Sequence, residues 1–113
     1  MILGSGGGVT GQITSYIFLE DGRLFKTNSL KPDSLVLVRS IFASTAKKYF
    51  DNAAKLGLAK KKFNKPGNLS FFVRLKTTAT KQEEVQWGQA KTTPPKDVKA
   101  FYDGFFKNII PKE

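Results

Sequence analysis

The first regular pattern along the chain is an alternation of apolar and polar residues from Gln12 to Glu20, which predicts a strand. Leu24–Thr27 continues in the same way and predicts its return partner. Asp21-Gly22 stands between the two stretches, and this dipeptide favours a two-residue hairpin turn because both central positions of such a turn need positive φ. In that register Phe18 faces Phe25.

Three further stretches alternate or carry short β-branched runs, and they predict strands at Ser34–Arg39, Leu69–Lys76 and Glu83–Gln89. The last two are separated by Thr77–Lys81, which is long enough for a hairpin loop. Two adjacent hairpins of this kind are typical of an antiparallel sheet.

The period changes to three and four residues in two places, and each change predicts an amphipathic helix. The first helix extends from Ser44 to Leu56, with Ser44 as its N-cap and Gly57 as the left-handed residue that ends it. The second helix begins at Thr93, its expected N-cap, and carries an apolar stripe to Ile109.

The resulting order is β-β-β-α-β-β-α in a chain of 113 residues, which is the length of one domain. We therefore expect a single α+β domain over 1–113, with an antiparallel sheet of four or five strands and two helices on one face. The segment 1–11 precedes the first predicted strand. Its glycines, from Gly4 to Gly11, predict a flexible or sharply turning leading segment.

Composition removes much of the usual enzyme chemistry. The chain contains no Cys and no His, which excludes disulfides, thiolate or imidazole metal sites and Ser-His nucleophiles. Its acidic residues fall on predicted turns, solvent faces and helix starts, and Glu83 and Glu84, as neighbours on a strand, face opposite sides. We expect no enzymatic activity, no cofactor and no metal.

The glycine segment also matches the dinucleotide-binding pattern G-x-G-x-x-G from Gly6 to Gly11. That motif needs a strand before it and a helix after it, so that helix N–H groups point at a pyrophosphate. A strand is predicted after this one. A bend or a contact loop is therefore the favoured interpretation.

A net charge of +10 and a lysine-rich loop raise nucleic-acid binding as one function. Cations would contact phosphates, and a neighbouring aromatic residue, Phe72, would stack on a base of a single strand. In the alternative, purely structural interpretation, the lysines are solvated and Phe72 packs beneath a helix. The residues of this hypothesis are Lys60, Lys61, Lys62, Lys65, Phe72 and Arg74.

Residues at the predicted strand ends suggest the other function, a loop-built surface that binds a protein partner. A single Trp is more often a core anchor than a contact residue, and that alternative stays open for Trp87. The candidate residues are Gly6, Gly7, Gly8, Val9, Thr10, Pro66, Gly67, Asn68 and Trp87.

Several of these motifs together resemble small exported or lipid-anchored bacterial domains of unassigned role. More distantly, the glycine opening, hairpin, helix and closing strand pair resemble the emfourin-type inhibitors of protealysin-like metalloproteases, which usually carry an aromatic where this chain has Val9 and are often acidic. The motifs that carry the first resemblance are Gly-Ser-Gly-Gly-Gly-x-Thr-Gly at 4–11, Tyr16 with Asp21-Gly22, Lys55-Leu56-Gly57-Leu58, Pro66-Gly67-Asn68 and Trp87-Gly88.

The resemblance implies a non-enzymatic, lipoprotein-like interaction domain of the bacterial cell envelope that works outside the cytoplasm, periplasmic or lipid-anchored. It also implies an export leader ahead of this chain, and a protease as one form of the protein partner. No apolar run in the sequence approaches the roughly 18 to 20 residues of a membrane span.

Overall fold

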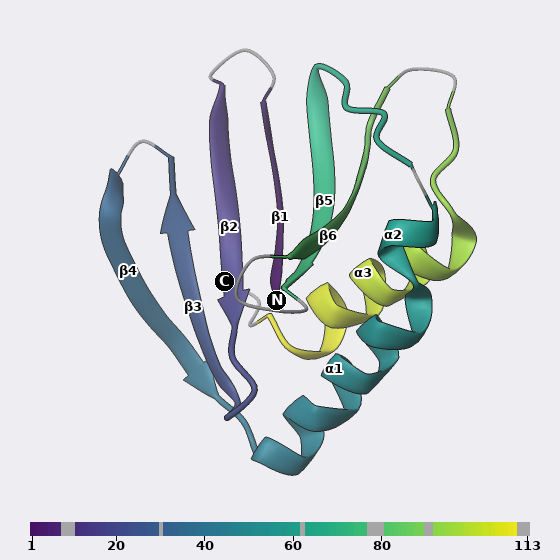
Figure 1. The fold of residues 1–113 in the computed structure, drawn as a ribbon. Coiled ribbons are helices and arrows are strands. Elements are labelled where there is room, and N and C mark those ends of the chain that lie inside the picture. The colour runs from purple at the N-terminus through teal and green to yellow at the C-terminus, as the bar shows by residue number, and fades with distance from the viewer. Residues whose placement is uncertain (8–10, 30, 62, 77–80, 90–91, 111–113) are drawn as a thin grey trace.

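Alternating segments of the chain pair into one antiparallel sheet, as the computed structural model in Figure 1 shows. The structure describes residues 1–7, 11–29, 31–61, 63–76, 81–89 and 92–110. Six strands make the sheet: β1 (Ile2–Gly7), β2 (Gln12–Phe18), β3 (Arg23–Asn28), β4 (Lys31–Ser40), β5 (Leu69–Lys76) and β6 (Gln82–Trp87).

The strands lie in the order β4-β3-β2-β1-β5-β6, and every neighbouring pair is antiparallel. The first four strands form a meander. The chain then crosses the sheet through α1 (Ala43–Leu56) and the short α2 (Leu58–Lys61), and returns as β5 on the other side of β1. The α+β fold class and the antiparallel sheet are confirmed, and the element order gains one strand at its start.

That additional strand is β1, and the prediction of a flexible or turning segment is wrong for Gly4–Gly7. β1 lies in the middle of the sheet, bonded to β2 on one side and to β5 on the other. Glycine has no side chain and little intrinsic preference for strands, so this segment shows no alternation of apolar and polar side chains. Pairing with two neighbours places it in the sheet in spite of that weak preference. Residues 8–10 lie outside the described part of the chain.

The hairpin between β2 and β3 forms where expected but with a longer loop. Leu19 and Gly22 close a four-residue turn, in which the Gly22 N–H donates to the Leu19 carbonyl at 3.0 Å, and Gly22 has φ +100°. This combination is a three-residue loop that ends in a left-handed glycine. The extra residue shifts the register, so Phe18 pairs with Leu24 and not with Phe25.

The helices occupy the predicted stretches, but their caps differ. Phe42 is the N-cap of α1 and makes no side-chain cap bond, so Ser44 lies inside the helix. Likewise α3 (Lys96–Asn108) starts after Pro95, and the prediction of Thr93 as its cap is wrong. Gly57 ends α1 in the left-handed conformation, as predicted.

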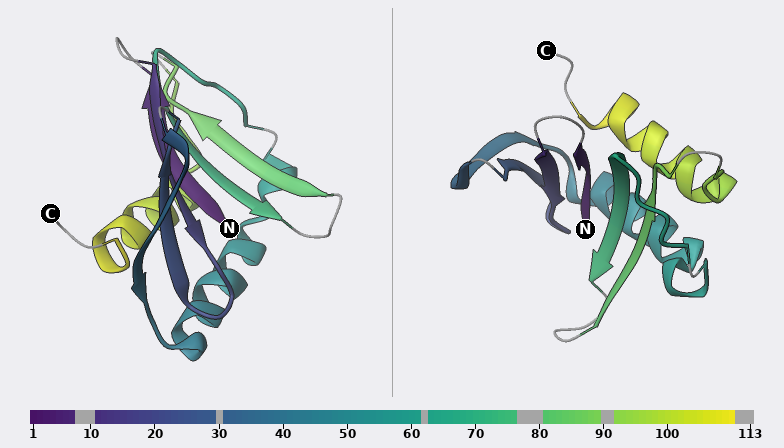
Figure 2. Two further views of the ribbon diagram at one scale, coloured as in Figure 1. Left: turned by 90° about the vertical axis from the view of Figure 1, so that its left-hand side faces the viewer. Right: turned by 90° about the horizontal axis from the view of Figure 1, so that it is seen from above.

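The core lies between the sheet and the two long helices, which pack on the same face (Figure 2). Phe18 of β2 is fully buried and shows this arrangement most directly. Its ring stacks on Phe50 of α1 at 5.6 Å and meets Phe105 of α3 edge-on at 5.3 Å. Such aromatic pairs add about 0.5–1.5 kcal/mol each beyond the area they bury.

A side chain at Gly4 should destabilise the fold. A Cβ placed there would lie 2.2 Å from the Thr14 carbonyl oxygen and 2.7 Å from the Phe72 ring. We expect Gly4→Ala to lower the free energy of unfolding by about 1–3 kcal/mol through overpacking. Urea denaturation followed by circular dichroism measures the change.

Gly104→Ala is the matched control, since Gly104 lies inside α3 with no atom within 4 Å of its added Cβ. It should raise the free energy of unfolding by about 0.5–1 kcal/mol through helix propensity. Equal effects of the two substitutions would contradict the tight packing at Gly4.

Candidate functional site

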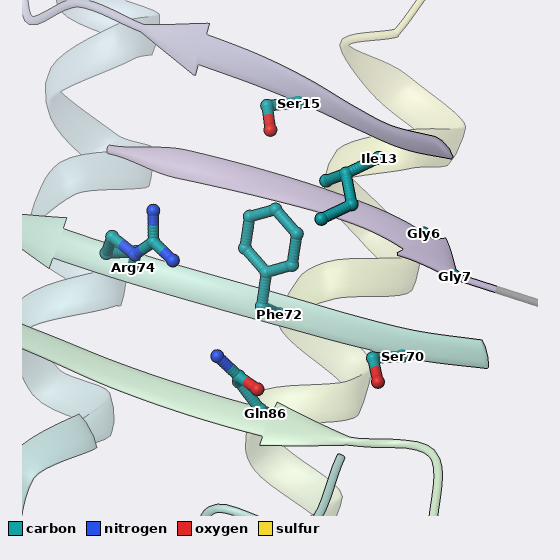
Figure 3. A pocket seen from close by; sticks show the side chains of 8 residues that line it. All are labelled: Gly6, Gly7, Ile13, Ser15, Ser70, Phe72, Arg74 and Gln86. Atoms are coloured by element: carbon teal, nitrogen blue, oxygen red, sulfur yellow. The ribbon is translucent and has the colours of Figure 1, made fainter. Parts of the chain in front are cut away.

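The sheet face opposite α1 and α3, here called the open face, contains a hollow of about 350 Å³ over β1. Figure 3 views this groove with the helices behind the strands. Its lining comes from β1 and β2 near the start of the chain and from β5 and β6 in its second half: Gly6, Gly7, Ile13, Ser15, Ser70, Phe72, Arg74 and Gln86.

The groove exists because β1 has no side chains at Gly4 and Gly6 on this face. The register sets Ser15 and Phe72 on either side of Gly4. In the same way Ile13 and Ser70 flank Gly6. The neighbouring strands therefore supply the walls, and the glycine backbone is the floor.

One wall is held by a network of contacts around Glu84. Both Arg74 Nε and Gln86 Nε2 donate hydrogen bonds to the Glu84 carboxylate. The Arg74 guanidinium also lies 5.2 Å from the centre of the Phe72 ring, within the range of a cation–π contact. The carboxylate balances the charge of Arg74, so this wall is close to neutral.

Two of the predicted binding loops meet at the end of the sheet beside the groove. A Cβ on Gly67 would lie 2.2 Å from the Gly88 carbonyl oxygen, and one on Gly7 would lie 2.3 Å from the Asn68 carbonyl oxygen. These backbone approaches bring the ends of β1, β5 and β6 together. Pro66 and Asn68 are exposed there.

The other predicted binding residues are not part of this surface as described. Gly8, Val9 and Thr10 lie outside the described residues. Trp87 is 6% exposed and packs edge-on against Tyr102 at 5.0 Å, on the helix side of the sheet. Trp87 is therefore the core anchor of the alternative interpretation.

Tyr102 supports the groove floor from beneath. Its hydroxyl donates a hydrogen bond to the carbonyl oxygen of Gly4 at 3.2 Å. Burial raises the pKa of the Tyr102 hydroxyl to about 12, because the charged phenolate would lose its solvation. This hydrogen bond connects α3 to β1 at Gly4, where β1 has no side chain that could pack against the helix.

The residues of the nucleic-acid hypothesis divide between two regions. Phe72 and Arg74 lie on the open face, and Phe72 is only 7% exposed, which leaves little of its ring for a base. This position also differs from the expected packing beneath a helix. Lys60 and Lys61 belong to α2, where Lys61 Nζ donates to Asp97 at 2.6 Å.

The remaining lysines of that hypothesis give no further cluster. Lys65 is exposed, and its N–H donates to the Gln86 carbonyl at the outer side of β6. Lys62 lies outside the described residues. Of the described lysines, Lys60 and Lys61 lie on α2, on a different element from Phe72 of β5.

Several of the acidic groups that the structure describes are engaged in ion pairs. A hydrogen bond from the Arg23 N–H lowers the pKa of Asp21, and one from Lys61 lowers the pKa of Asp97. Asp103 pairs with Lys99 one turn away on α3. Within the described ranges no three acidic residues come close enough to hold a metal ion.

Sequence reasoning missed four lining residues, Ile13, Ser15, Ser70 and Gln86. The signal was present in β2 and β5, which carry apolar residues on both faces. Tyr16 and Phe18 already supply the side chains of β2 that pack against the helices. Ile13 and Ile17 therefore lie on the opposite face, where core packing does not explain two apolar residues. Contiguous apolar positions on the face opposite the core indicate a binding surface, whereas a single one does not.

No family model matches the chain, and no curated protein or solved structure is significantly similar to it. The resemblance to envelope domains and to emfourin-type inhibitors therefore depends on the sequence motifs alone. Among the helices of the described residues, none has the length and apolar character to cross a membrane.

The raised pKa of Tyr102 predicts a loss of stability at high pH. Below pH 10 the hydroxyl is protonated in both states, so its contribution to folding is complete. Between pH 10 and about 12 the unfolded state ionises first, and this contribution is lost as pH rises. The difference in unfolding free energy between wild type and Tyr102→Phe should therefore shrink by roughly 2 kcal/mol over this interval.

Urea titrations of both proteins at several alkaline pH values measure this difference, and absorbance of the phenolate follows the ionisation directly. Comparison with the variant removes every pH-dependent contribution that the two proteins share. A difference that stays constant with pH would contradict the burial of the Tyr102 hydroxyl.

Proposed function

We propose that this protein is a non-enzymatic protein-binding domain whose groove on the open face receives an extended segment or a projecting side chain of a partner. The single observation that carries the proposal is the groove over β1, with its glycine floor and one wall held by hydrogen bonds. Pre-formed walls favour binding because less freedom is lost when the partner docks.

The lining suits a protein surface. Ile13 is 43% exposed at one wall and offers an apolar contact. Ser15, Ser70 and Gln86 add hydroxyl and amide groups around it. Apolar contact surrounded by polar groups is the usual composition of a protein interface.

The electrostatics favour binding over catalysis. Glu84, the carboxylate next to the groove, already accepts hydrogen bonds from Arg74 and Gln86. A general acid or base would need a group poised to exchange a proton with a substrate. The net charge of +10 draws acidic partners toward the molecule at long range.

The place of action follows from the sequence resemblance and belongs to the same proposal. An interaction domain of the bacterial envelope meets its partner outside the cytoplasm, and a protease is the partner class that the emfourin-like motifs suggest. Gly67 and Asn68, beside the groove, are the loop residues in best position to extend such an interface.

Substitution of Ile13 tests the site. We expect Ile13→Asp to remove at least nine-tenths of the partner that wild-type protein captures from envelope fractions of the cells that make it, because a charge would be buried without a partner. Immobilised protein and quantitative mass spectrometry give the measurement.

Phe42→Asp is the matched control, since Phe42 is 83% exposed and follows the edge strand β4. It should retain the partner, and circular dichroism should show both variants folded. A partner that binds the Ile13→Asp variant as well as wild type would exclude the groove as its site, and no specific partner at all would contradict protein binding.

The inhibitor form of the proposal has a direct assay. Thermolysin is incubated with the domain, and cleavage of a fluorogenic peptide is followed. We expect wild type to lower the rate and Ile13→Asp to restore it. Unchanged cleavage, together with no complex on a sizing column, would remove the protease-inhibitor role and leave binding of another protein.

A further inference from the structure

β4 forms an outer edge of the sheet, at the left margin in Figure 1. Three consecutive apolar residues on it are about half exposed: Leu35 at 53%, Val36 at 55% and Leu37 at 53%. An edge strand presents backbone N–H and C=O groups that can pair with another strand. An apolar edge of this kind is a site for strand addition.

The opposite edge of the sheet is covered. The segment beside β6 bonds to it, with the Lys65 N–H donating to the Gln86 carbonyl at 3.0 Å and the Gln86 N–H donating to the Phe63 carbonyl at 3.3 Å. β6 also carries Glu83 and Glu84. Of the two edges, β4 is the one whose described residues remain apolar and accessible.

We propose that β4 pairs antiparallel with β4 of a second copy of this chain, about a two-fold axis at Val36. In this register Val36 of one copy faces Val36 of the other. Leu35 of each copy faces Leu37 of the other, because residues that stand directly opposite share a face of the sheet. The pairing is isologous and closes as a dimer.

The self-complementary pattern favours a second copy as the occupant. The β3–β4 register sets Leu37 on the open face and Val36 on the helix side. Where the extended backbone continues through Leu35, the axis at Val36 gathers four leucines on the open face. An axis moved to Leu35 would set Ser34 against Val36, and one moved to Leu37 would set Leu35 against the charged Arg39. Of these symmetric registers, the one with its axis at Val36 has the best apolar match.

The distribution of charge allows this approach in spite of the net charge of +10. Between Ser34 and Ser40 the only charged residue is Arg39, whose guanidinium already donates to the Ile109 carbonyl at 3.2 Å. The exposed lysines of the helix layer, such as Lys48 and Lys107, belong to other elements. Two copies meet at β4 with little local repulsion.

The expected affinity is modest. A stable interface buries about 800 Å² per partner, and three half-exposed aliphatic side chains supply only part of that area. Register shifts between β3 and β4 also limit the regular part of β4 to the stretch that contains Val36 and Leu37. We therefore expect a reversible dimer with a dissociation constant on the order of micromolar.

Sedimentation equilibrium at increasing protein concentration tests the dimer. We expect wild type to move from 12.5 kDa toward twice that mass. Leu37→Lys should remain monomeric, because it sets a charge within the apolar pairing. Leu69→Lys is the matched control, since Leu69 is also half exposed, at 50%, but lies on β5. It should dimerise like wild type.

A single cysteine tests the axis, because the chain contains none of its own. Val36→Cys sets the two thiols opposite each other across the axis, with Cβ atoms roughly 4.5–5.5 Å apart, within reach of a disulfide after small adjustment. Mild oxidation should yield a covalent dimer on a non-reducing gel, whereas Leu69→Cys should not.

The dependence of dimer formation on salt concentration is a further test of the occupant. Because both copies carry the same net charge, added salt should strengthen the association. An acidic peptide bound at β4 would be released by salt instead. This response therefore distinguishes a second copy from an oppositely charged occupant.

Four results would overturn the proposal: a wild-type monomer at every concentration, open-ended polymers, equal disruption by Leu69→Lys, or a dimer that Val36→Cys does not cross-link. Circular dichroism of each variant shows whether it folds, and the cysteine variant serves if Leu37→Lys does not. The Ile13→Asp variant should dimerise normally, so failure of the groove and failure of the dimer are separate outcomes.

Discussion

The close approach of three strands at Gly4 is the constraint on which the rest of the structure depends. β1 bonds to β2 and β5 at once, and at Gly4 the space that a side chain would need is occupied by the Thr14 carbonyl and the Phe72 ring. The same residue accepts the Tyr102 hydroxyl from the helix side. Gly4 therefore lies at the point where β2, β5 and α3 all contact β1.

This constraint also makes the two faces of the sheet different. On the helix side, large aromatic rings from β2, α1 and α3 fill the interior around Phe18. On the open face, the missing side chains of β1 leave a groove whose walls are the cross-strand neighbours Ile13 and Ser70. On the helix side, β1 contributes the buried side chain of Leu3 to the core. On the open face, the absence of a side chain at Gly6 leaves room for the groove.

The sequence predicts those parts of the fold that have a repeating pattern. Alternation and helical period located β2 to β6 and both long helices, because burial of one face imposes a period on the side chains. β1 has no such period, since glycines record no burial, and its pairing is decided by strands that come later in the chain. The predicted register of the β2–β3 hairpin was wrong for a local reason. Asp21-Gly22 is compatible both with a two-residue turn and with the observed three-residue loop that ends in a left-handed Gly22.

The site shows the same limit. Gly6, Gly7, Gly67 and Asn68 were predicted to lie in loops of a binding surface. The structure brings them to one end of the sheet, although Gly6 and Gly7 belong to strand β1. Ile13 and Gln86 were not recognised, because their place beside the groove depends on which strand lies next to which. Sheet order across β1 is non-local: β5 joins β1 only after α1 and α2 have crossed the sheet. The alternating pattern alone does not contain that information.

The positions of the groove and of β4 determine what a dimer would present. In an antiparallel edge pairing the two-fold axis is perpendicular to the sheet, so both open faces are on the same side of one continuous sheet. β2 and β3 separate β1 from the edge, and each groove therefore stays clear of the interface. Two equivalent grooves on one surface favour a partner that is itself repeated or anchored in an array. Against such a partner, the second contact forms at a high effective concentration, so a modest affinity at each groove is sufficient.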